Sequence, residues 1–116
     1  LGNKEGAEVY NRKLNSDMVF DLVLLGLGED GHTASIFPNS EFDESKQAVP
    51  ISNAPKPPKN RVSLTPNRLS MADNVIFLVT GKDKKNALDK FKNSENIPAT
   101  RITAQKNFKV LISGVN

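Results

Sequence analysis

The sequence predicts an α/β fold built on a doubly wound, mostly parallel sheet. Two apolar runs, 19–26 and 75–80, show no alternation with polar residues, which is typical of parallel strands covered on both faces. Each run breaks at glycine and leads to a segment with helical spacing, the order expected of strand–helix units. A sheet with only two buried strands is too narrow to keep water away from both of its faces. We therefore expect the 116 residues to be part of a larger domain, or to need a partner chain.

Composition narrows the class of protein. Hydrophobic residues make up 37% of the chain, and a mean hydropathy of −0.43 is not low enough for disorder. No apolar run reaches the ~18 residues of a membrane span, and the N-terminus lacks a secretory signal pattern. The absence of cysteine excludes disulfides and thiolate metal sites, so a cytoplasmic protein is expected. The net charge of +3 comes from scattered lysines, which argues against nucleic-acid binding and suits small anionic ligands.

The first elements follow from the spacing of their apolar residues. Between Ala7 and Leu14 these residues recur at intervals of three and four, which predicts an amphipathic helix over residues 5–15. The apolar run 19–26 is predicted to be a central strand covered on both faces. Residues 28–38 are expected to form a loop and a short helical turn that ends at proline.

Residues 39–60 are predicted to be a polar, proline-rich loop inside a single partial domain that spans 1–116. Within this loop, 48–51 reads as a short extended segment. Residues 55–59 hold three prolines and predict a stiff, polyproline-like crossing over the surface.

The second half of the chain repeats the order of strand and helix. Residues 61–64 predict a short strand with Val62 and Leu64 on one face. Thr65 is expected to cap a helix that has Pro66 at its first position, a favoured start. The remaining predicted elements are a strand at 75–80, a helix at 83–93, a connector at 96–99 and a strand at 108–112.

The glycines of residues 26–31 match the GxGxxG pattern of dinucleotide-binding loops. Such a loop needs a long helix and an acidic residue about 20 positions further on. Here Pro38 ends any helix early, 49–51 holds no acid, and Glu29 and Asp30 would place negative charge against a pyrophosphate. We therefore interpret the glycines as permitting a tight turn.

His32, the only histidine, is the sharpest candidate for chemistry. It follows a buried strand, Asp30 is placed to orient its ring, and the expected helical turn offers free N–H groups to an anion. Imidazole titrates near neutral pH and suits a general base on water. Spacing alone leaves a structural role equally open. One histidine without cysteine predicts no metal site.

Two basic residues are candidates for anion binding. Helix geometry places Lys84 in the middle of the apolar face of the 83–93 helix, near its positive end. That position is explained by a bound phosphate, or alternatively by a side chain that extends along the apolar face to water. For Arg61, spacing favours an ordinary surface arginine over a second anion contact.

Together these segments resemble the 6-phosphogluconolactonase family. The matching pieces are FDLVLLGLGEDGHTASIFP, PKPPKNRVSLTP and VIFLVTGKDKKNAL, with NIPA matching more loosely. Their order and spacing agree over most of the chain. The related glucosamine-6-phosphate deaminases share the Asp-Gly-His core but continue with a different run that carries a catalytic glutamate.

The resemblance implies hydrolysis of 6-phospho-D-glucono-1,5-lactone to 6-phosphogluconate, in the pentose phosphate pathway and without a cofactor. His32 would be the general base, with Asp30 setting its orientation. The N–H groups of Gly28 and Gly31 would face the developing oxyanion. Lys84 matches the lysine that would hold the 6-phosphate, and Arg61 matches the family arginine expected to contact the substrate.

The resemblance also implies the C-terminal half of a Rossmann-like domain with helices on both faces of the sheet. The N-terminal half, with its glycine-rich phosphate loop, has no counterpart in this sequence. We therefore expect an incomplete pocket and low activity from the chain alone. Two alternatives stay open: a glucosamine-6-phosphate isomerase or deaminase, and a non-catalytic fragment that binds sugar phosphates.

Overall fold

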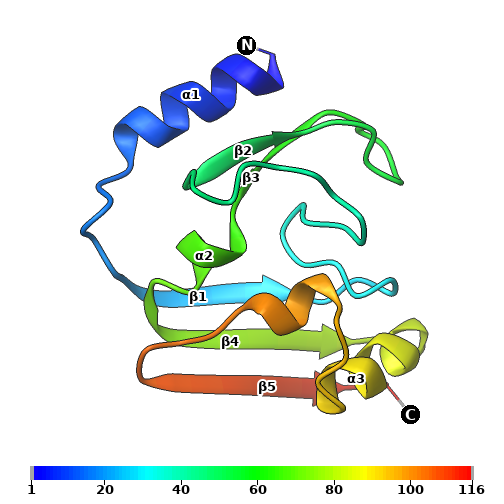
Figure 1. Ribbon diagram of the computed structural model, residues 1–116. Coiled ribbons are helices and arrows are strands. Elements are labelled where there is room, and N and C mark those ends of the chain that lie inside the picture. Colours follow the sequence, from blue (N-terminus) through cyan, green and yellow to red (C-terminus); the bar gives the residue numbers. More distant parts are fainter. Residues whose placement is uncertain (1, 116) are drawn as a thin grey trace.

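A computed structural model describes residues 2–115 of the chain. Its main feature is a three-stranded parallel sheet in the order β1-β4-β5 (Figure 1). The strands are β1 (Phe20–Gly26), β4 (Ala72–Thr80) and β5 (Asn107–Ser113). The predicted parallel α/β fold is confirmed, and the last two strands are longer than their apolar runs suggested.

One face of this sheet carries the main hydrophobic core. Side chains alternate along a strand, so Val23 and Leu25 of β1 point to the same side as Val75 and Phe77 of β4. This side is covered by α3 (Lys85–Lys92), by α2 (Pro66–Leu69) and by the short 3₁₀ helix η2 (Pro98–Arg101). The predicted inner face of the 83–93 helix is confirmed, since Ala87 and Leu88 are buried.

The opposite face of the sheet is open. Leu22 and Leu24 are 50% and 57% exposed, and Leu78 and Leu111, paired across β4 and β5, are 46% and 52% exposed. The prediction of a central first strand covered on both faces is therefore wrong for this chain. Within residues 2–115, β1 pairs with β4 alone and forms an edge, while β4 is central. Strand order depends on pairing between distant segments, which the composition of a strand does not reveal.

A second, smaller layer is formed by α1 (Asn3–Lys13), β2 (Ala48–Ile51) and β3 (Arg61–Leu64), with β2 and β3 antiparallel (Figure 1). The Asn11 side chain joins the helix to the strand: its Oδ1 accepts from the N–H of Ala48 at 2.9 Å, and its Nδ2 donates to the carbonyl of Ala48 at 2.6 Å. The extended segment at 48–51 is confirmed.

The apolar pair Val62 and Leu64, predicted to share one face, does not form the buried face of β3. Ser63 is 4% exposed, whereas Val62 is 37% exposed, so the inner face of the strand is the one with the serine. The predicted helix start at Thr65 is confirmed, because its side chain accepts a hydrogen bond from the backbone N–H of Arg68.

Two local expectations fail in the loops. Residues 28–38 form turns with a single bridge between Thr33 and Ile36, and the expected helical turn is absent. Residues 55–59 lie exposed on the surface as predicted, but they form a run of bends and not a straight polyproline helix. In the part of the chain that is described, no helix has the length and apolar character to span a membrane.

Candidate active site

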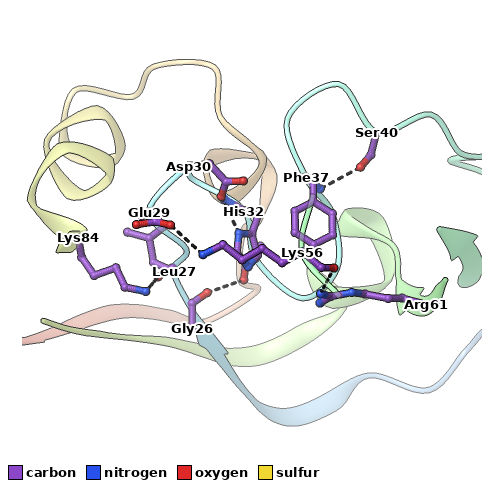
Figure 2. Close-up of polar contacts among 11 residues, drawn as sticks. Gly26, Leu27, Glu29, Asp30, His32, Phe37, Ser40, Lys56, Arg61 and Lys84 are labelled. Atoms are coloured by element: carbon purple, nitrogen blue, oxygen red, sulfur yellow. Dashed lines mark hydrogen bonds and ion pairs between the residues drawn. The ribbon is translucent and has the colours of Figure 1, made fainter. Parts of the chain in front are cut away.

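The candidate site is a glycine-rich loop at the carboxyl end of β1, on the edge of the sheet where α/β proteins bind ligands. The loop is folded back on the strand by Thr33, whose buried hydroxyl donates to the carbonyl of Gly26 at 2.8 Å. Its backbone closes on itself: the N–H of Gly28 donates to the carbonyl of His32 at 2.8 Å. Figure 2 shows the side chains that this compact turn brings together.

His32 and Asp30 form a directly bonded pair, as the sequence predicted. The ring Nδ1 lies 2.5 Å from Oδ1 of Asp30, and the same oxygen accepts the backbone N–H of His32 at 3.0 Å. Because a carboxylate only accepts, Nδ1 is the nitrogen that donates, and in the neutral ring the lone pair therefore lies on Nε2. No group among residues 2–115 hydrogen-bonds to Nε2. The ring is therefore oriented with its basic nitrogen available.

Burial acts to raise the pKa of Asp30, but the hydrogen bonds from the backbone and ring of His32 outweigh it and hold that pKa below its usual value. The carboxylate therefore keeps its charge at neutral pH beside an imidazole that remains 26% exposed. Such an anion stabilises the imidazolium that forms when Nε2 takes up a proton.

Gly28 is required by the position of the histidine ring. A Cβ on this residue would lie 2.0 Å from Nδ1 of His32, so the imidazole occupies the space that any other side chain would fill. Gly31 has a different reason: its φ is +89°, and a Cβ there would approach Ile97 at 2.9 Å. Both glycines shape the site through sterics.

The oxyanion role expected for these two glycines finds no support in the hydrogen bonding. The N–H of Gly28 is bonded to the carbonyl of His32, and the N–H of Gly31 donates to the carbonyl of Gly28 at 2.9 Å. Both donors are used inside the turn. The sequence suggested a glycine loop with free amides, but only the folded backbone shows where each N–H points.

Lys84 reaches the same loop from the next strand–helix unit. It lies in the 3₁₀ helix η1 (Lys82–Lys84), which replaces the first turn of the predicted helix. Its half-buried side chain turns inward and donates from Nζ to the carbonyl of Leu27 at 2.8 Å (Figure 2). The predicted inward direction is therefore confirmed, and the residue whose carbonyl the ammonium group contacts directly precedes Gly28.

Arg61 is directed toward its own loop. Its Nε donates to the carbonyl of Pro58 at 2.9 Å, and its Nη2 donates to the carbonyls of Lys56 at 3.0 Å and Pro57 at 3.3 Å. Its guanidinium carbon also lies 5.2 Å from the centre of the Phe37 ring.

Two residues near the histidine were missed by sequence reasoning. The Phe37 ring lies 4.6 Å from the His32 ring, centre to centre. Lys56 donates to Glu29 at 2.8 Å; this hydrogen bond and the opposite charge lower the pKa of Glu29 and raise that of Lys56. The Lys56–Glu29 contact joins segments far apart in the sequence, and no local pattern signals it. Phe37 lies in the same loop as His32, but whether the two rings meet depends on how the turn between them folds. No three His, Cys, Asp or Glu side chains in the described part of the chain are placed to hold a metal ion.

The fold and the loop define a Rossmann-like α/β protein that presents a carboxylate–histidine pair and a lysine at the carboxyl edge of a parallel sheet. Residues 2–112 match the family described as glucosamine-6-phosphate isomerases/6-phosphogluconolactonase. The chain belongs to this family, and within it to the 6-phosphogluconolactonases.

The similarity to 6-phosphogluconolactonases holds in sequence and in structure. The chain is 45% identical to the human 6-phosphogluconolactonase over 89 residues, which cover 70% of the chain and 34% of that protein. It is 39% identical to the bovine 6-phosphogluconolactonase over 110 residues, which cover 85% of the chain and 43% of that protein. The chain thus spans less than half the length of these curated relatives.

Solved structures agree. The 6-phosphogluconolactonase from Thermotoga maritima superposes with a TM-score of 0.84 at 30% identity, over 93% of this chain and 50% of that one. The 6-phosphogluconolactonase from Trypanosoma brucei superposes with a TM-score of 0.76 at 36% identity, over 93% of this chain and 50% of that one. A monomeric glucosamine-6-phosphate deaminase gives 0.76 at 18% identity, which shows a shared fold alone.

Proposed function

We propose that this chain carries the histidine half of an active site that hydrolyses 6-phospho-D-glucono-1,5-lactone to 6-phosphogluconate. The observation that carries the proposal is the His32–Asp30 pair, with Nδ1 held by the carboxylate at 2.5 Å and Nε2 free to accept a proton. The identity to 6-phosphogluconolactonases supports the substrate class. The cytoplasmic location stays a prediction.

In the proposed reaction, His32 is the general base. Nε2 takes a proton from water while the water oxygen bonds to the lactone carbonyl carbon, which gives a tetrahedral oxyanion. Asp30 stabilises the imidazolium so formed. When the oxyanion collapses, the bond to the ring oxygen breaks, and that oxygen takes the proton from Nε2. The imidazole is then restored and the product is the open-chain acid.

Lys84 is the proposed anchor for the 6-phosphate. Its ammonium already donates to the carbonyl of Leu27 beside Gly28, so the cation sits on the same loop as the base. An ammonium bonded to one carbonyl keeps two further donors for phosphate oxygens.

The test measures lactone hydrolysis above the spontaneous rate, on the 116-residue chain and on the protein in its natural length, for wild type and His32→Gln. We expect His32→Gln to lower kcat by about 10²- to 10⁴-fold with little change in KM. Release of ammonia from glucosamine 6-phosphate, without lactone hydrolysis, would instead assign the deaminase reaction. If the natural-length protein binds 6-phosphogluconate but does not hydrolyse the lactone, the chain is a sugar-phosphate-binding module and not a hydrolase.

A further inference from the structure

The segment 55–60 crosses the surface beside the glycine loop, and the Arg61 side chain bonds its backbone. Arg61 follows it directly and bonds the carbonyls of three consecutive residues, 56–58, through Nε and Nη2. A planar guanidinium is suited to this, because its donors are fixed in one fork, whereas a lysine ammonium offers no such arrangement. Arg61 therefore sets the path of the proline segment.

The same guanidinium lies over Phe37 and connects the segment to the histidine. Its carbon is 5.2 Å from the Phe37 ring centre, within the range of a cation–π contact. Phe37 is 5% exposed, and its ring lies 4.6 Å from that of His32 at an interplanar angle of 40°. The aromatic ring thus contacts both the arginine and the imidazole, and Figure 2 shows the two side chains beside it.

A second connection runs through Lys56. Arg61 bonds the backbone of this lysine, and the lysine side chain extends to Glu29, at 2.8 Å, in the glycine loop. Glu29 immediately precedes Asp30, the residue that orients the histidine. An exposed ion pair of this kind contributes little by itself, but here it ties the proline segment to the loop at a second point.

We propose that Arg61 is a positioning residue for His32, acting through Phe37 and the 55–60 segment, and does not contact the substrate. The Nε–Nη2 edge, one of the edges at which an arginine can bind an anion at two points, is occupied by loop carbonyls. Positioning matters because a displacement of about 1 Å in a catalytic group can cost on the order of 10²-fold in rate. The catalytic part of this inference rests on the proposed function, whereas the placement of the ring does not.

The single histidine allows a test that needs no turnover, since all imidazole NMR signals of the chain belong to His32. In wild type we expect contacts between the His32 and Phe37 ring protons and a ring-current shift of the His32 signals. Arg61→Gln and Arg61→Lys should both lose these signatures, the latter although it keeps the charge. Lys59→Gln removes a positive charge from the same exposed segment and serves as the matched control, with the signals unchanged.

Kinetics and ligand binding give the second readout. If the natural-length protein turns over the lactone, Arg61→Lys should lower kcat by about 10- to 10²-fold at unchanged KM. Binding of 6-phosphogluconate should be unaffected by Arg61→Lys. The inference is overturned if both Arg61 variants keep the His32 and Phe37 signatures, or if they weaken 6-phosphogluconate binding while the histidine signals stay in place. If the wild-type protein does not hydrolyse the lactone, the proposed function is wrong, but the NMR test of the Arg61 inference still applies.

Discussion

Replacing Gly28 with alanine would test the geometry of the site most directly. The new Cβ would lie 2.0 Å from Nδ1 and 2.1 Å from Cε1 of His32, where protein Cβ atoms essentially never come within 3.0 Å of a neighbour. Gly28 is outside the set of positive-φ residues, so the methyl group adds no backbone strain. The collision with the imidazole is therefore the main effect of the substitution.

The size of the effect follows from these separations. The ring must shift by about 1 Å to relieve the contact, and a shift of that size in a catalytic group costs on the order of 10²-fold in rate. The 2.5 Å bond to Asp30 breaks as the ring moves. Because both side chains are partly exposed, solvent compensates for most of that loss, and we expect the free energy of unfolding to fall by only about 1 kcal/mol. Turnover should thus suffer far more than stability.

Gly26→Ala is the matched control, because a Cβ at Gly26 meets no atom within 4 Å. Lactone hydrolysis in the natural-length protein and the NMR signals of the single histidine are compared for the two variants. The reasoning fails if Gly28→Ala keeps the turnover and the His32 signals of the Gly26→Ala control.

Three further predictions concern Asp30, Lys84 and the two faces of β1. The pKa of Asp30 is lowered in the folded protein, so this carboxylate stabilises the fold at pH values above its usual pKa of 3.8. That contribution is lost as the pH falls through the folded pKa. Asp30→Asn should therefore weaken the acid dependence of urea unfolding, and it should also reduce kcat. Lys84→Met should weaken binding of 6-phosphogluconate by about 1.5–3 kcal/mol in titration calorimetry, while Lys85→Met, on the exposed side, should not. Leu25→Ala should cost about 2–5 kcal/mol in urea unfolding, but Leu24→Ala, 57% exposed, no more than about 0.5 kcal/mol; equal losses would show that the open face is covered in solution.

Much of the fold was predictable from local sequence patterns. The strand at 61–64, the cap at Thr65 and the inward direction of Lys84 were all predictable, because each depends on residues only a few positions apart. The His32–Asp30 pair was predictable for the same reason, since two residues of one tight turn have few ways to be arranged.

Tertiary structure alone decided the properties that depend on distant segments. Whether β1 or β4 is central depends on which strands pair, and both are equally apolar. The amides of Gly28 and Gly31 looked free in the sequence, yet the closed turn uses both.

The sequence by itself determined the parallel α/β class, the histidine–carboxylate pair and the inward direction of Lys84. The folded chain decided that one sheet face stays open, and that Arg61 bonds the carbonyls of residues 56–58 and lies over Phe37. The physical reason is the range of the interactions. Hydrophobic periodicity and capping act within a few residues, whereas a guanidinium bonds whichever carbonyls the fold brings to it.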